Sequence, residues 1–233
     1  MNAVITGATK GIGLAIAHKF AKNGIDLILN SRNEEDLSTI KEDFNQAYAN
    51  VTIHTFKADL SDKKATQALG QYCIDCFGNI DILVNNAGVF LPGETHNEEE
   101  GTLEKMIETN LYSAYYLSQA LIPGMLSTSS GHIFNMCSIA SKIAYPNGGS
   151  YSISKFALLG FSKVLREELK DKGIKVTAIL PGATWSNSWA GVELPESRLM
   201  QANDIAQAVW SATQMSASAV VEEIVIRPQL GDL

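Results

Sequence analysis

The stretch that decides the fold lies at the start of the chain, where residues 2–13 read NAVITGATKGIG. Its apolar first part, Asn2–Thr6, predicts a β-strand that leads directly into the glycines Gly7, Gly11 and Gly13. Because glycine has no Cβ, such a turn lets backbone approach a pyrophosphate, and a following helix offers free N–H groups. The spacing G-x-x-x-G-x-G differs from G-x-G-x-x-G and from the Walker pattern. After an N-terminal strand it favours a dinucleotide site over an ordinary strand-to-helix turn.

The alternation of strand and helix continues along the whole chain. The expected strands are Asn2–Thr6, Asp26–Asn30, Val51–Lys57, Ile80–Asn85, His132–Cys137, Lys175–Leu180 and Val220–Arg227. The expected helices are Gly11–Asn23, Glu34–Tyr48, Asp62–Cys76, Thr102–Met125, Tyr151–Lys172 and Asp204–Gln214. Nearly continuous apolar strands such as IDILV at 80–84 are typical of a parallel sheet covered on both faces. We therefore expect an α/β fold, a Rossmann-like doubly wound parallel sheet of about seven strands flanked by helices.

Length and composition exclude several classes of protein. The 233 residues suffice for one large core, and we expect a single domain over 1–233 with a short lid at about 183–203, where no periodicity is visible. The net charge of −7 argues against a nucleic-acid partner. No apolar run reaches the roughly 18 residues of a membrane span, and no signal peptide is recognisable. Three cysteines, an odd number at low density, favour a cytoplasmic location.

The end of the second expected strand indicates which dinucleotide would bind. The segment reads Leu29-Asn30-Ser31-Arg32-Asn33, and no acid that could accept hydrogen bonds from both ribose hydroxyls precedes Glu34. The planar cation of Arg32 suits a 2′-phosphate, and Lys10 adds a second positive charge. NADP is therefore favoured over NAD, with a solvated loop arginine as the alternative. The acids at 34–36 suit the first turn of the next helix.

A second group of residues has the types needed for proton transfer. Tyr151 and Lys155 lie four residues apart and would share one helical face, where the ammonium would lower the pKa of the phenol. Ser138 follows an expected strand, at the edge of the sheet where ligands bind. Asn110 lies in a helical pattern, where asparagine is unfavourable, so a helix kink or a surface amide is its alternative interpretation.

Taken in order, these motifs strongly resemble the short-chain dehydrogenase/reductase family. The resemblance covers about residues 1–182 and rests on TGATKGIG at 6–13, Asp59-Leu60, NNAG at 85–88, Asn110, Ser138, Tyr151, Lys155 and Pro181-Gly182. It implies an NADP(H)-dependent enzyme that interconverts a carbonyl and a secondary alcohol by hydride transfer. Tyr151 would be the general acid/base, Lys155 would hold the nicotinamide ribose, and Ser138 would orient the substrate oxygen. Asn110 would anchor a water of the proton relay.

The resemblance also implies the residues that bind the cofactor. They would be Gly7, Thr9, Lys10, Gly11, Ile12, Gly13, Ser31, Arg32, Asp59, Leu60, Asn86, Ala87, Gly88, Tyr151, Lys155, Pro181, Gly182 and either Thr184 or Ser186. Many relatives have a threonine where this chain has Ser186, and the end of the chain lacks the Asp-Gly-Gly of the family. Enzymes with these motifs act on sugars, steroids, acyl thioesters, quinones and small ketones, so the motifs name no single substrate.

The remaining expectations concern the pocket, the cysteines and assembly. Phe90, Leu91 and the 139–145 loop would complete the pocket wall, and Trp185, Trp189, Leu194 and Met200 would either line it or pack on their own domain. Cys73 and Cys76 read as structural, no metal ligand is nominated, and Glu98–Glu100 reads as a solvated helix start. The family resemblance implies a homodimer or homotetramer through the helices 102–125 and 151–172. The alternatives are an NAD-dependent alcohol dehydrogenase and a regulator that senses nicotinamide cofactors without turnover.

Overall fold

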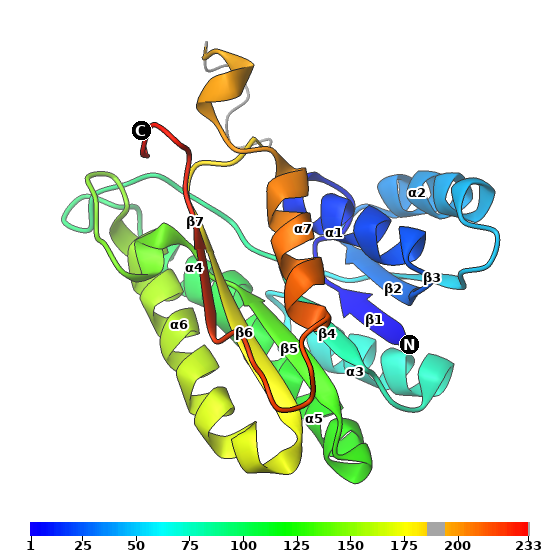
Figure 1. Ribbon diagram of the computed structural model, residues 1–233. Helices are drawn as coiled ribbons and strands as arrows, with labels where there is room; N and C mark the ends of the chain where they lie inside the picture. Colours follow the sequence, from blue (N-terminus) through cyan, green and yellow to red (C-terminus); the bar gives the residue numbers. More distant parts are fainter. Residues whose placement is uncertain (186–193, 233) are drawn as a thin grey trace.

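The computed structural model describes residues 1–185 and 194–232, and in this part of the chain seven strands form one parallel sheet (Figure 1). Their order across the sheet is β3-β2-β1-β4-β5-β6-β7. The strands are β1 (Asn2–Ile5), β2 (Asp26–Ser31), β3 (Ile53–Lys57), β4 (Ile82–Asn85), β5 (Gly131–Met136), β6 (Ile174–Pro181) and β7 (Glu223–Ile226). The predicted Rossmann-like doubly wound sheet is confirmed.

Helices cover both faces of the sheet (Figure 1). One face carries α1 (Gly11–Lys22), α2 (Glu34–Ala47) and α7 (Ala202–Thr213), which bury Phe20, Phe44 and Val209. The other carries α3 (Lys63–Phe77), α5 (Ser113–Thr128) and α6 (Gly149–Leu169), which bury Leu69, Leu117 and Leu165. None of the helices in the described residues is long and apolar enough to cross a membrane.

The strand order places a crevice at the carboxyl edge of the sheet. From β1 the chain runs outward through β2 to β3, then returns to build β4 to β7 on the other side of β1. Ligands of such sheets bind outside the carboxyl ends of the strands, where the order reverses. The turn after β1 and the loops after β4, β5 and β6 meet at this edge.

The structure differs from the sequence prediction in the helix expected over 102–125. It consists of α4 (Thr102–Ile107), a π-helical turn (Glu108–Tyr112) and α5, which continues through Pro123 to Thr128. The π turn contains Asn110, whose side chain is buried. A π-helical turn inserts one residue into the helical ladder and is frequent at functional sites. Of the two alternative interpretations of Asn110, the surface amide is wrong, because the side chain is buried. The helix-kink interpretation agrees with an irregular turn at this position.

Candidate active site

The glycine turn after β1 packs tightly against the segment that follows β4. Gly7 has a φ of +60°, and a Cβ on Gly13 would lie 2.4 Å from the carbonyl oxygen of Gly7. The Asn86 side chain donates to the carbonyl oxygens of Thr6 and Gly7 at 2.9 and 3.0 Å. The Thr6 hydroxyl accepts from the backbone N–H groups of Asn86 and Ala87. The two glycines therefore let helix α1 approach the turn, and Asn86 keeps the turn in place.

Two adjoining cavities run along this edge of the sheet and share the glycine turn. The larger, of about 840 Å³, is lined by Gly7, Thr9, Lys10, Ser31, Arg32, Asp59, Leu60, Ala87 and Gly88 among others. The second, of about 680 Å³, is lined by Gly7, Lys10, Gly11, Ile12, Asn86, Ala87, Gly88, Ser138, Tyr151, Lys155, Pro181, Gly182 and Thr184 among others. The structure thus brings together nearly all the residues named from sequence. Gly13 and Asn110 line neither cavity but contact residues that do, Gly7 and Val89 respectively. Ser186 and Trp189 lie outside the described residues.

The phenol and the ammonium lie on one face of α6. The Lys155 side chain is buried, and its Nζ donates to the carbonyl oxygen of Met136 at 2.7 Å. The same nitrogen lies 5.8 Å from the centre of the Tyr151 ring. Burial lowers the pKa of the Lys155 ammonium to about 8, because a charged group is poorly solvated there.

The pKa of Tyr151 moves in the direction opposite to the one expected from sequence. Burial raises the pKa of the phenol, and a hydrogen bond with the Ser138 side chain lowers it only in part. Lys155, whose ammonium donates to the Met136 carbonyl, does not contribute to this shift. The expectation of a lowered pKa is therefore wrong for this structure, in which the phenol keeps its proton at neutral pH.

Ser138 and Asn110 hold the surroundings of the phenol in place. The Ser138 hydroxyl accepts from the Ala140 N–H at 3.1 Å, just beyond β5. The Asn110 side chain accepts from the Val89 N–H at 2.7 Å and donates to the Val89 carbonyl at 3.0 Å. It also donates to the hydroxyl of Ser154, which donates in turn to the Tyr151 carbonyl. Asn110 therefore ties the loop after β4 to the helix that carries Tyr151.

Glu98 has a role that the sequence did not indicate. Its carboxylate accepts from the Ser150 N–H at 2.9 Å and from the Ser150 hydroxyl, at the first turn of α6. A Cβ on Gly149 would lie 2.2 Å from the Glu98 carboxylate oxygen, so the contact requires glycine there. A carboxylate at a helix N-terminus also interacts favourably with the helix dipole. The prediction of a solvated helix start is wrong for Glu98, because its carboxylate caps α6 at Ser150, the residue before Tyr151.

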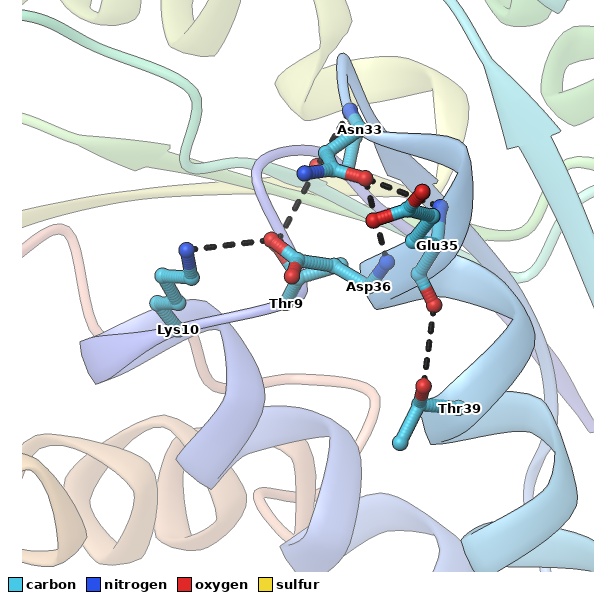
Figure 2. A network of polar contacts seen from close by, with 7 residues as sticks. Thr9, Lys10, Asn33, Glu35, Asp36 and Thr39 are labelled. Atoms are coloured by element: carbon cyan, nitrogen blue, oxygen red, sulfur yellow. Dashed lines mark hydrogen bonds and ion pairs between the residues drawn. The ribbon is translucent and has the colours of Figure 1, made fainter.

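The larger cavity is bounded by a network of polar contacts between the glycine turn and the start of α2 (Figure 2). Lys10 Nζ lies 3.0 Å from a carboxylate oxygen of Asp36, and the Thr9 hydroxyl donates to that of Ser31 at 3.1 Å. The Asn33 side chain caps α2 by accepting from the N–H groups of residues 35 and 36. The glycine turn and the start of α2, which both belong to the predicted cofactor site, are therefore joined by direct contacts.

Arg32 also meets a carboxylate in this cavity. Its guanidinium lies 4.0 Å from Asp59, whose carboxylate accepts from the Ser61 N–H and hydroxyl. Burial alone would raise the pKa of Asp59, but the hydrogen bonds from Ser61 and the charge of Arg32 together lower it. Asp59 is thus ionised at neutral pH and partly neutralises the cation that the sequence assigns to a 2′-phosphate.

The far end of the second cavity is formed by residues near the end of the sequence. Arg227 and Asp232 line it together with Gly182 and Thr184, and an ion pair of 2.6 Å joins the two charged residues. A Cβ on Gly182 would lie 2.2 Å from the Asp232 carboxylate. Sequence reasoning missed Arg227 and Asp232, because this part of the chain lies beyond the recognisable family motifs.

The remaining wall of this cavity is apolar. It consists of Phe90, Ile139, Ile143 and Tyr145, and the Phe90 ring meets the Tyr151 ring edge-on at 4.9 Å. Burial raises the pKa of the Tyr145 phenol to about 12.

Several other residues named from sequence lie outside the lining. Leu91 and Leu194 do not line the cavity, and Met200 is buried among the core residues of the α7 face. Burial raises the pKa of the Cys73 thiol to about 12, which suits a structural cysteine. Across residues 1–185 and 194–232 no cluster of three His, Cys, Asp or Glu residues could hold a metal ion.

Comparison with known proteins places this geometry in a family. The family model described as short chain dehydrogenase matches residues 1–196. Sepiapterin reductase of Chlorobaculum tepidum is 34% identical over 238 residues, covering 99% of this chain and 97% of its own. An uncharacterized oxidoreductase of Staphylococcus epidermidis is 34% identical over 226 residues, covering 97% of this chain and 96% of its own. The structure of an alcohol dehydrogenase from the archaeon Thermococcus sibiricus, complexed with 5-hydroxy-NADP, has a TM-score of 0.91 at 26% identity, covering 100% and 98% of the two chains. With this sequence match and this fold, the chain belongs to the short-chain dehydrogenase/reductase family of oxidoreductases.

Proposed function

We propose that the protein is an NADP(H)-dependent enzyme that reduces a carbonyl to a secondary alcohol, or catalyses the reverse reaction. The observation that carries this proposal is that Ser138, Tyr151 and Lys155 line the same cavity as the glycine turn. A phenol, a hydroxyl and an ammonium around one cavity can bind a substrate oxygen and supply its proton. A regulator that only sensed the cofactor would have no use for this set.

The residues present fit a nicotinamide dinucleotide. The closely packed turn at Gly7 and Gly13 leaves backbone exposed to the cavity, and helix α1 begins beside it at Gly11. Lys10 and Arg32 supply cations for a 2′-phosphate in the larger cavity, and Lys155 supplies donors for the nicotinamide ribose. Thr184 lies at the cavity end beyond Pro181 and Gly182, where a carboxamide would bind. When bound, NADPH supplies the hydride.

The chain's own residues bind the carbonyl and supply the proton. The Ser138 hydroxyl lies beside the Tyr151 phenol and lowers its pKa, and both side chains line the same cavity, so a substrate oxygen placed near them would accept from both hydroxyls. Because burial raises the pKa of Tyr151, the phenol is protonated at neutral pH and can donate its proton to the oxygen as it gains charge. Lys155 and the contacts of Asn110 hold α6 and the loop after β4 around this oxygen. The protonated phenol is the form that reduction requires at neutral pH.

Oxidation of NADPH, measured with a panel of carbonyl compounds, tests the proposal. Purified protein should oxidise NADPH in the presence of a carbonyl compound. Sepiapterin is the first compound to test, because a relative that matches 99% of this chain is a sepiapterin reductase. Tyr151→Phe should lower kcat by at least about 100-fold, in line with the loss of a positioned proton donor, while NADPH still binds. Equal turnover by Tyr151→Phe would contradict the mechanism. Preference for NADH would favour the NAD-dependent alternative.

We further propose that the enzyme is a homodimer or homotetramer assembled through α5 and α6. Large apolar side chains are exposed on these helices and the turn before them, namely Tyr112, Tyr115, Ile153, Phe156 and Val164. Their contiguous burial against a second copy would remove apolar surface from water.

A further inference from the structure

We propose that Asp36 is a specificity-determining residue that limits the preference for NADP(H) over NAD(H), because it pairs with the lysine that would bind the 2′-phosphate. The inference deepens the proposed function and rests on it. Asp36 would act as a built-in competitor of the phosphate in the larger cavity.

Lys10 and Asp36 both line that cavity, and Figure 2 shows the contact between their side chains. Lys10 is the residue before α1, and Asp36 lies in the first turn of α2. Their charged atoms are 3.0 Å apart, which is hydrogen-bonding distance. A phosphate that binds Lys10 must therefore share this cation with the carboxylate or take its place.

The start of α2 offers little compensation. Helix N-termini bind anions through their free N–H groups, but the Asn33 side chain already accepts from those of Glu35 and Asp36. The Ser31 hydroxyl accepts from the Thr9 hydroxyl and from the Asn33 N–H, which leaves its own proton as a single neutral donor for a phosphate. A 2′-phosphate in this cavity therefore depends chiefly on charged side chains.

Those charged side chains are already paired with one another. Each cation lining the cavity lies near one acid lining it: Lys10 near Asp36 at 3.0 Å, Lys57 near Glu34 at 3.3 Å and Arg32 near Asp59 at 4.0 Å. Glu35 also lines the cavity, so four acids face three cations, and the lining carries one excess negative charge (3 − 4 = −1). The site holds the cations that a phosphate needs and, beside each of them, a charge that repels it.

Among these acids Asp36 is placed to have the strongest effect. Its pair has the shortest distance of the three, and its side chain is 30% exposed, against 53% for Asp59 and 71% for Glu34. Water screens a less exposed charge less, so its attraction to Lys10 and its repulsion of a phosphate are larger. Asp36→Asn keeps an oxygen that can accept from Lys10 but removes the charge.

The test compares dissociation constants of NADPH and NADH, measured by calorimetry, for the wild type, Asp36→Asn and Glu42→Gln. Asp36→Asn should tighten NADPH binding about fivefold, which corresponds to the interaction of about 1 kcal/mol between unit charges close together in water. NADH affinity should change less than twofold, because NADH lacks the phosphate. Glu42→Gln removes a charge from the same helix outside the cavity and should change the NADPH to NADH ratio by at most twofold.

The outcomes separate this inference from the proposed function. If the wild type binds NADPH but Asp36→Asn leaves the ratio unchanged or weakens NADPH binding, the role of Asp36 is refuted and the proposed function stands. If the wild type binds neither dinucleotide, both are refuted. Asp36→Ser, which also removes the carboxylate, provides the same comparison should Asp36→Asn fold poorly, as judged by circular dichroism.

Discussion

Replacing Gly13 by alanine should destabilise the protein and abolish cofactor binding. The added Cβ would lie 2.4 Å from the Gly7 carbonyl oxygen and 2.5 Å from the Asn86 side-chain nitrogen. Real carbon contacts are not this short, so helix α1 must move away from the turn, or Asn86 must release it. Asn86 holds the turn by two hydrogen bonds to the carbonyls of Thr6 and Gly7, and both lie next to the new methyl group.

The magnitude follows from three opposing effects. Overpacking by one methyl group costs about 1–3 kcal/mol. Losing the two hydrogen bonds costs about 1 kcal/mol each, while the higher helix propensity of alanine returns up to about 1 kcal/mol. The expected loss in the free energy of unfolding is therefore about 2–4 kcal/mol, and the expected fall in Tm for a chain of this size is about 4–8 °C.

Urea unfolding and calorimetric NADPH titration would measure both effects, with Ser38→Ala as the control. Ser38 is exposed inside α2 and lines neither cavity. Alanine there should stabilise the protein by about 0.5 kcal/mol through its higher helix propensity and should leave NADPH binding unchanged. The reasoning is refuted if the free energy of unfolding of Gly13→Ala lies within about 0.5 kcal/mol of the wild-type value. It is also refuted if the variant binds NADPH as tightly as the wild type does.

Three further predictions concern residues outside the glycine turn. Burial, with a smaller effect of Lys175, lowers the pKa of His132 to about 3, whereas an unfolded histidine titrates near 6.5. The unfolded chain therefore binds more protons between these values, so the free energy of unfolding should fall as the pH drops from about 6.5 toward 3. Urea unfolding of His132→Gln should show a flatter pH profile, and parallel profiles would contradict this. Glu98→Ala should lower kcat at least about tenfold by releasing the first turn of α6, with little change in the NADPH dissociation constant. Glu98→Gln should recover most of the loss, and an unchanged kcat in Glu98→Ala would exclude the positioning role. Phe156→Glu, on the exposed face of α6, should reduce the mass measured by light scattering to that of a smaller assembly, and an unchanged mass would argue against this interface.

Local patterns in the sequence predicted most of the fold. Strand and helix periodicity depends on neighbouring residues, so the ends of elements such as β1 and α1 could be predicted to within a few residues. The glycine turn was recognisable because its spacing lies within one strand-turn-helix unit. Tyr151 and Lys155 were predicted to share a helical face because their separation of four residues is one helical turn, and both line one cavity.

The tertiary structure alone decided which charges meet and how well each is solvated. Glu98 and Ser150 are 52 residues apart, and Ala183 and Asp232, which are also in contact, are 49 apart. No periodic pattern connects such positions, because only the packing of separate elements brings them together. The same holds for Lys10 and Asp36. The sequence suggested that Lys10 would bind a phosphate and that Asp36 would interact with a helix dipole, but the two side chains pair with each other. The pKa of Tyr151 was mispredicted for this reason: a neighbouring lysine can be read from spacing, but burial is a property of the whole fold.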